Sequence, residues 1–152
     1  NLCDAPIHVQ KRNRAEVEAQ AEELLQKMGL TGKEKAYPCQ LSGGQCQRLV
    51  IARALLRTDS AVYIFDEAAS NIDVESEELI MNVIHELAKT KTVLLISHRL
   101  ANVVKSDKIY FLKDGEIKES GKHEELMSQN GAYRHLYESQ MALENYGKGG
   151  MA

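Results

Sequence analysis

Two short apolar runs constrain the fold of this chain more than any other feature. The first, Ala61 to Phe65, ends at a pair of acidic residues, and the second, Thr92 to Ile96, ends at a Ser-His pair. Runs of this length with almost no polar residues are typical of strands buried in a parallel sheet. A helical pattern that begins at Asp73 separates them. Strands that alternate with helices predict a layered α/β fold with a parallel sheet.

Periodicity and turn residues predict the other elements. Asn13 with Glu16 has the spacing of a helix start, and Gly29 is a natural stop. Asp114-Gly115 between two strand-like runs indicates a hairpin. The expected elements are helices from Asn13 to Gly29, from Ser42 to about Arg57, from Asp73 to about Leu87, from Leu100 to Val104 and from His123 to Leu143 with a break near Asn130-Gly131, and a hairpin of Lys108 to Leu112 with Glu116 to Glu119.

Composition excludes several classes of protein. The formal net charge of −3 over 152 residues leaves no basic footprint for nucleic acid. No apolar run approaches the ~20 residues of a membrane helix, so we expect no span or targeting segment and a cytoplasmic setting. Cys3, Cys39 and Cys46 are odd in number and lack a CxxC pair, which favours reduced thiols. A zinc site of Cys39, Cys46 and a distant histidine is the weaker alternative.

The pentapeptide Leu41-Ser42-Gly43-Gly44-Gln45 opens the second predicted helix. Glycines at a helix start leave backbone N–H groups accessible, and these groups together with the helix dipole attract anions such as phosphate. In the alternative interpretation, Ser42 is only an N-cap and the glycines only form a turn. The pentapeptide alone does not decide between the two.

Polar residues also end both predicted strands. Asp66 and Glu67 follow the first strand, and Ser97 and His98 follow the second. Ligands of open α/β sheets bind at this edge, where a carboxylate can serve a magnesium ion or orient water. Solvated acids at a strand end and a structural histidine are the simpler explanation of each feature taken singly.

Taken together and in this order, the motifs resemble the nucleotide-binding domain of ABC transporters, over nearly the whole chain from Asn1 to about Leu143. The resemblance implies a partial P-loop NTPase fold, with a helical signature subdomain at 1–60, the C-terminal part of a RecA-like ATPase core at 61–143 and a disordered tail at 144–152. It implies ATP and Mg²⁺ as cofactors. It also implies a second ATPase domain and transmembrane permease domains as partners, at the inner face of the cell membrane.

Roles follow by position as the resemblance implies. Residues 42 to 45 match the signature motif, which contacts the γ-phosphate of ATP held by the opposite subunit: Ser42, Gly43, Gly44 and Gln45. The other matches are the Walker B aspartate that positions Mg²⁺, the catalytic base, the D-loop and the switch histidine, which correspond to Asp66, Glu67, Ser70 to Asp73, and His98. The D-loop Ser70-Asn71-Ile72-Asp73 has Asn and Ile where Ala and Leu are usual, and Cys46 stands where Gln or Glu is common.

The phosphate-binding motif G-x-x-x-x-G-K-[ST] is absent from the sequence. We therefore expect an ATP-binding and ATP-hydrolysing transporter subunit that is truncated and, as an isolated chain, inactive or very weak. The alternative function is a non-catalytic interaction module that docks on an intact ATPase or self-associates. A hydrolase built on Ser97, His98 and the acidic pair is disfavoured, because no G-x-S-x-G elbow occurs.

Two further expectations concern the chain as a whole. Residues 1–56 look like importer ATPases for polar amino acids and residues 61–140 like exporter ATPases, which suggests a recombined gene joined near residues 57–60. The resemblance also implies a central strand between the Thr92 to Ile96 and Lys108 to Leu112 strands, which this sequence lacks. Because unpaired strand edges are costly, we expect self-association by exchange of elements with a second copy.

Overall fold

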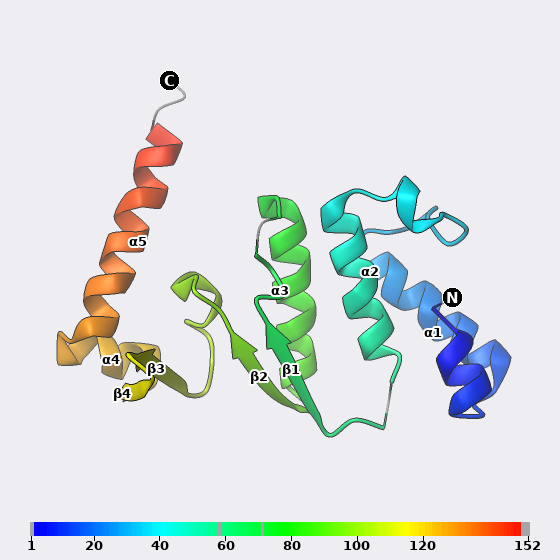
Figure 1. The fold of residues 1–152 in the computed structure, drawn as a ribbon, viewed down its shortest axis with the longest axis horizontal. Helices are drawn as coiled ribbons and strands as arrows, with labels where there is room; N and C mark the ends of the chain where they lie inside the picture. The colour runs from blue at the N-terminus through cyan, green and yellow to red at the C-terminus, as the bar shows by residue number, and fades with distance from the viewer. Residues whose placement is uncertain (1, 58, 71, 150–152) are drawn as a thin grey trace. The chain divides into compact units, whose positions relative to one another are not determined.

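The computed structural model describes residues 2–57, 59–70 and 72–149 and divides into two compact units, Asn1–Ile96 and Ser97–Ala152 (Figure 1). The boundary expected at residue 60 falls inside the first unit. The first unit contains η1 (Ala5–Val9, a π-helical turn), α1 (Arg14–Lys27), η2 (Pro38–Gln40, a 3-10 turn), α2 (Gly43–Leu55), β1 (Val62–Asp66), α3 (Val74–Ala88) and β2 (Thr92–Ile96).

The two apolar runs form the expected parallel pair. β1 and β2 are neighbours in register, with Val62 opposite Thr92 and Asp66 opposite Ile96, and α3 connects them. The α/β fold with a short parallel sheet is thus confirmed for this unit.

Polar caps set the helix starts where the sequence placed them. The Asn13 side chain accepts hydrogen bonds from the N–H groups of Ala15 and Glu16, and Asp73 accepts one from Ser76 N–H. The second helix ends two residues earlier than predicted. Arg12 donates to the Leu56 carbonyl and the Tyr63 hydroxyl to the Arg57 carbonyl, at 2.8 and 2.6 Å, so tertiary donors hold the two carbonyls that follow the helix end.

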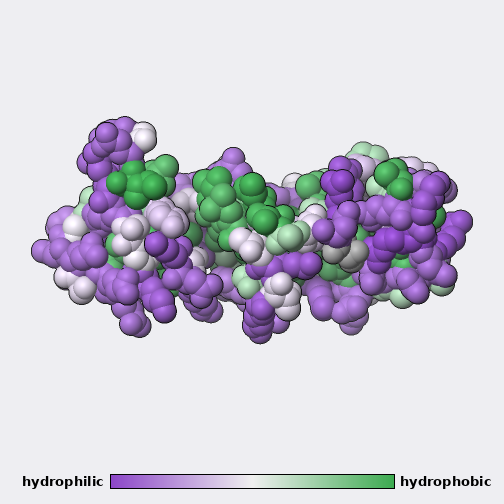
Figure 2. Space-filling model, turned by 90° about the horizontal axis from the view of Figure 1, so that it is seen from below, coloured by the Kyte–Doolittle hydropathy of each residue, from purple (hydrophilic) through white to green (hydrophobic). Residues whose placement is uncertain are grey.

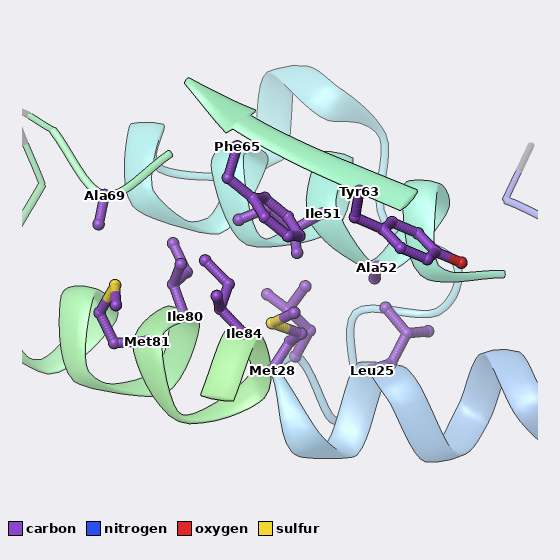
Figure 3. Packing of buried hydrophobic residues seen from close by; sticks show 11 residues of the cluster. Leu25, Met28, Ile51, Ala52, Tyr63, Phe65, Ala69, Ile80, Met81 and Ile84 are labelled. Atoms are coloured by element: carbon purple, nitrogen blue, oxygen red, sulfur yellow. The ribbon is translucent and has the colours of Figure 1, made fainter. Parts of the chain in front are cut away.

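The core of the first unit lies between one face of the sheet and the three helices (Figure 3). Tyr63 and Phe65 of β1 stack with their ring centroids 6.4 Å apart, and they point toward buried side chains of the helices. Those side chains include Leu25 and Met28 of the first helix region, Ile51 and Ala52 of α2, and Ile80, Met81 and Ile84 of α3. The alternation of buried and exposed residues along β1 follows from the two-residue period of a strand.

The other face of this sheet is apolar and exposed. Val62 and Ile64 of β1 are 54% and 64% exposed, and Leu94 and Ile96 of β2 are 49% and 45% exposed. We call these four residues the open sheet face. Apolar side chains also gather in visible patches on the surface drawn in Figure 2. The sequence predicted strands buried on both faces, and within this unit only one face is covered, because all three helices pack on the same side.

The second unit is a hairpin with helices. It contains η3 (Leu100–Asn102), β3 (Ile109–Lys113), β4 (Glu116–Gly121), α4 (His123–Gln129) and α5 (Ala132–Gly149). β3 and β4 pair antiparallel, which confirms the hairpin. The helix expected at Leu100 to Val104 is a single 3-10 turn. The backbone of α5 continues six residues into the segment 144–152 for which the sequence predicted disorder.

The predicted break near Asn130-Gly131 separates α4 from α5. Asn130 has a left-handed backbone with φ of 53°, and the Glu119 carboxylate accepts hydrogen bonds from the N–H groups of Ala132 and Tyr133. A carboxylate at the N-terminus of α5 is favourable because it meets the positive end of the helix dipole. Tyr133 is fully buried, and its hydroxyl lies 2.8 Å from His123 Nδ1.

Candidate functional site

The Ser42-Gly43-Gly44-Gln45 segment forms a capped helix start. Ser42 Oγ accepts a hydrogen bond from Gln45 N–H, and Gln45 Oε1 accepts one from Ser42 N–H, at 3.3 and 3.0 Å. The simpler interpretation of Ser42 as an N-cap therefore holds in this structure. It does not exclude an anion site, because the Ser42 hydroxyl keeps its own proton to donate. The N–H groups of Gly43 and Gly44 lie in the first helical turn, where they point out of the helix end.

Gly44 brings this helix start against the start of α3. A Cβ atom at Gly44 would lie 2.9 Å from Ser76 Oγ and 3.1 Å from Asp73 Oδ2, so only glycine allows the approach. At Gly43, by contrast, none of the described atoms lies within 4 Å of a Cβ. The structure therefore brings together two motifs that the sequence separates by almost thirty residues, the signature segment and Asp73. Asn71 of the predicted D-loop lies outside the described residues.

Asp73 is held as a carboxylate by its neighbours. Ser76 Oγ donates to Asp73 Oδ2 at 2.7 Å, and Ser76 N–H donates to Oδ1 at 2.8 Å. These two hydrogen bonds from Ser76 lower the pKa of Asp73 below its usual range, and the positive charge of Arg48 adds a smaller effect in the same direction. The carboxylate thus caps α3 and faces Gly44 at once.

Arg48 also lies in this candidate site, although no motif in the sequence points to it. It lies one turn after Gly44 on α2, is only 8% exposed, and its Nε finds no hydrogen-bond partner among the described atoms. A buried guanidinium with an unused donor is costly unless an acceptor satisfies it. The i to i+4 spacing from Gly44 was visible in the sequence, but the burial of Arg48 depends on tertiary packing.

The acidic pair sits at the carboxyl end of β1. Glu67 has a left-handed backbone with φ of 51°, a conformation that is uncommon for residues other than glycine. Its N–H donates to the Ile96 carbonyl at 3.0 Å, and its carbonyl accepts from Ser70 N–H and Ser70 Oγ. Strained backbone of this kind concentrates at functional sites. The pattern of hydrogen bonds fixes Glu67 next to the end of β2.

A side chain from the signature helix holds the residue after the acidic pair. Gln47 Nε2 of α2 donates to the Ala68 carbonyl at 2.5 Å. The first unit therefore ties the signature helix, the acidic turn and the start of α3 into one region. The sequence does not predict this role of Gln47, because a contact across 21 residues leaves no local pattern.

His98 belongs to the second unit, where α5 holds its backbone. Gln140 Nε2 donates to the His98 carbonyl at 2.7 Å, and Gln140 Oε1 accepts from Leu100 N–H at 2.9 Å. Arg99 also meets Glu144 of α5, with Nη2 and Oε1 3.5 Å apart. Seven of the eight predicted site residues thus lie in the first unit, and His98 lies in the second, where α5 supports its backbone.

Metal binding would need more than these residues. Among residues 2–57, 59–70 and 72–149 no group of three or more His, Cys, Asp or Glu side chains could enclose a metal ion. Cys3, Cys39 and Cys46 are free thiols. Mg²⁺ is usually bound by one or two carboxylates together with water and substrate phosphates, so the single carboxylate of Asp66 would need water and phosphate to complete a site. No helix in the described part of the chain is long and apolar enough to cross a membrane.

Comparisons with known proteins show which family this chain resembles. Residues 3–70 match the protein family described as ABC transporter. An uncharacterized ABC transporter ATP-binding protein of Haemophilus influenzae is 54% identical over 104 residues, which cover 68% of this chain and 18% of that protein. The ATP-dependent lipid A-core flippase of Vibrio vulnificus is 45% identical over 137 residues, or 86% of this chain and 23% of the flippase.

The chain belongs to the ABC transporter ATPase family. A solved structure of a bacterial Atm1-family ABC exporter with ATP bound is similar to it with a TM-score of 0.68 and 29% identity, over 84% of this chain and 23% of the exporter. The match confirms the ABC ATPase fold that the resemblance implied. This chain spans about a fifth of the length of these relatives. The hypothesis of a gene joined near residues 57–60 stays a prediction.

Proposed function

We propose that this ABC ATPase chain supplies the signature side of a shared ATP site, as part of a transporter subunit that binds and hydrolyses ATP. The observation that carries the proposal is the meeting of two helix starts at Gly44, where Asp73 and the buried Arg48 lie. N-terminal ends of helices attract phosphate. An unsatisfied Arg48 Nε beside them gives the region a further donor for an anion or for a residue that orients one.

The roles proposed for individual residues follow from their chemistry. The Ser42 hydroxyl and the N–H groups of Gly43 and Gly44 would donate to phosphate oxygens, with Gln45 holding Ser42 in place. Asp66 would help hold Mg²⁺, which when bound neutralises charge on the phosphates. Glu67, fixed at the strand end by the Ile96 carbonyl, would orient water as general base. His98 would contact the terminal phosphate.

No segment with the spacing of a phosphate-binding loop occurs in this sequence. We therefore expect the isolated chain to bind Mg²⁺-ATP with a dissociation constant in the millimolar range or weaker, because several charge-assisted hydrogen bonds of ~1.5–3 kcal/mol each are lacking. Isothermal titration calorimetry of the full chain measures this. A micromolar constant would show that other residues grip the phosphates and that the shared-site proposal is wrong.

A mixing experiment tests the signature role itself. An intact ATPase domain of a flippase relative, carrying its own phosphate-binding loop, would be titrated with this chain with and without Mg²⁺-ATP. If the signature side meets a nucleotide held by the other domain, association will depend on ATP, and Ser42→Ala will weaken it by roughly tenfold, the value of one such hydrogen bond. Association of equal strength without ATP would contradict the proposal.

Association that ignores ATP would instead favour the second candidate, a non-catalytic interaction module. The open sheet face supports this alternative, because four adjacent apolar side chains are exposed on it. Under either candidate the partners would be ATPase domains, with permease domains at the inner face of a membrane. The transported substrate is outside the proposal, because the flippase names describe relatives of which this chain covers about a fifth.

A further inference from the structure

Two cysteines flank the signature segment. Cys39 lies in the 3-10 turn η2 and Cys46 in the first turns of α2, so all of Leu41 to Gln45 lies between them. Cys39 is exposed and Cys46 is half-buried, and both are free thiols. The eight residues from Cys39 to Cys46 would form a small ring if the two sulfur atoms were joined.

The structure directs the Cys46 sulfur back toward the turn that contains Cys39. Side chains of a helix lean toward its N-terminus. Cys46 Sγ accordingly lies 3.7 Å from the carbonyl oxygen of Pro38 and 4.0 Å from that of Leu41, and its thiol donates to both. Pro38 is the residue bonded directly to Cys39, so the sulfur of one cysteine contacts the peptide unit of the other.

Chain geometry sets an upper limit on the distance between Cys46 Sγ and Cys39. A carbonyl oxygen lies roughly 2.8 Å from the next Cα atom, so Cys46 Sγ is within roughly 6.5 Å of the Cys39 Cα. In a disulfide the sulfur atoms are bonded at about 2.0 Å and the Cα atoms lie about 4.4–6.8 Å apart, so the turn that contains Cys39 must move toward Cys46 before a bridge can close. The turn is free to make this movement, because none of the residues of η2 is buried and Tyr37 before it is 71% exposed.

We propose that Cys39 and Cys46 form a reversible disulfide that encloses the signature segment. With oxidised glutathione as oxidant, the exposed Cys39 thiolate attacks one glutathione sulfur and releases the first glutathione thiol. The Cys46 thiolate then attacks the Cys39 sulfur of this mixed disulfide and releases the second. One S–S bond breaks and one forms, two protons leave the chain, and two electrons pass to glutathione.

The bridge would act directly on the proposed anion site. Its ring contains Ser42, Gly43 and Gly44, whose donors must be free to approach a phosphate held by another domain. Tying Cys46 to the preceding turn would fix this segment and limit that approach. The effect on ATP-dependent association rests on the proposed function, whereas the bridge itself does not.

Cys3 provides an internal control for general thiol oxidation. Burial raises the pKa of the Cys3 thiol, so less of it is thiolate at neutral pH and it reacts more slowly. Cys3 also lies in a different tryptic peptide, 1–11, whereas Cys39 and Cys46 share peptide 36–48 because no Lys or Arg separates them.

The test is peptide mass spectrometry of the full chain after equilibration in glutathione buffers, acid quenching and alkylation. We expect peptide 36–48 to lose two hydrogens and take up no alkylating reagent, with the bridged form exceeding mixed glutathione disulfides by about tenfold, since a neighbouring thiol acts at a high effective concentration. Peptide 1–11 should remain a thiol. Cys39→Ser and Cys46→Ser should each convert the bridge to a single glutathione adduct, and Cys3→Ser should leave it unchanged.

Other outcomes overturn the proposal. Separate glutathione adducts on Cys39 and Cys46 would show that the two sulfurs do not meet, and so would disulfide-linked dimers through either one. Thiols that stay reduced at both positions, in a glutathione buffer that oxidises Cys3, would also contradict the bridge. Because the readout is a mass and needs no nucleotide, these failures are distinct from a failure of the proposed ATP site, which the mixing experiment reports.

Discussion

Gly44 is the residue at which size matters most in the candidate site. A Cβ there would approach Ser76 Oγ to 2.9 Å, and Ser76 is buried, so the side chain cannot move away freely. We expect Gly44→Ala to lower the free energy of unfolding by ~1–3 kcal/mol through overpacking. Urea denaturation measures it.

Gly43→Ala is the matched control for this prediction. No atom of the part of the chain that the structure describes lies within 4 Å of a Cβ at Gly43, and the φ of Gly43 is not left-handed, so alanine fits. We expect no loss, or a gain of up to about 1 kcal/mol from the helix preference of alanine. Equal stability of the two variants would show that the starts of α2 and α3 are not packed as described.

The charge of Asp73 makes a second prediction at this scale. Its pKa is lowered in the folded chain chiefly by hydrogen bonds from Ser76. The resulting stability is present above the ordinary pKa of an aspartate and is lost as the pH falls through the lower, folded value. Ser76→Ala removes the largest cause, so the pKa of Asp73 should rise toward its usual range, as a carboxyl-carbon NMR titration would show.

The control for Asp73 is Ser128→Ala, because the Ser128 hydroxyl donates only to the Glu125 carbonyl of its own helix. That variant should leave the titration of Asp73 unchanged. An unchanged pKa of Asp73 in Ser76→Ala would mean that the hydroxyl does not hold the carboxylate.

Residues differ in how far the sequence predicts them. Asn13, Ser42 and Asp73 were recognised as helix caps because a cap acts on the three residues that follow it. Arg48 and Gln47 were not recognised. Arg48 matters because it is buried near Asp73, and Gln47 matters because it donates to the Ala68 carbonyl. Neither partner is close to its residue in the sequence.

At the scale of elements, Gln140 of α5 holds the backbone of residues 98–100 in the second unit. We expect Gln140→Leu to remove both hydrogen bonds to the backbone of residues 98–100. Two hydrogen bonds of about 1 kcal/mol each hold this loop, so the Leu100 amide should exchange its hydrogen roughly 5–30 times faster. Hydrogen exchange with NMR detection reads this amide directly.

Ser139→Ala is the control for Gln140. Ser139 precedes Gln140 on α5, and its hydroxyl donates only to the His135 carbonyl within the helix. Exchange at Leu100 should be unaffected by this variant. If the exchange rate of the Leu100 amide rises equally in both variants, a general destabilisation of α5 explains the effect, and the two Gln140 hydrogen bonds do not.

The sequence predicts well those elements that depend on neighbouring residues, and it predicts the exact ends of the elements less well. The strands, the hairpin and the break at Asn130 follow from apolar runs and turn residues. The end of α2 differs from the prediction, and Arg12 and Tyr63 donate to the carbonyls of Leu56 and Arg57 that follow it. No periodic pattern in the sequence predicts the π-helical turn Ala5–Val9. Such differences arise where distant groups supply hydrogen bonds that local sequence does not encode.

For the whole molecule, the open sheet face leads to a prediction of self-association. Among the residues that the structure describes, the parallel sheet has two strands, which leaves one edge of each strand unpaired, and such small sheets are marginal alone. Exposed strand edges pair readily with other chains, and apolar patches favour contact. We therefore expect the chain to associate with a second copy, by exchange of elements that covers Val62, Ile64, Leu94 and Ile96.

Light scattering coupled to size exclusion, at several protein concentrations, measures this association. Wild type should give a mass above that of one chain that rises with concentration, and the double variant Ile64→Lys with Leu94→Lys should shift it toward one chain, because it places two charges on the open sheet face. Val50→Lys is the control, since Val50 is equally exposed, at 61%, on α2 away from this face. A wild-type mass of one chain at every concentration would mean that the exposed sheet is stable without a partner, and that the expected exchange does not occur.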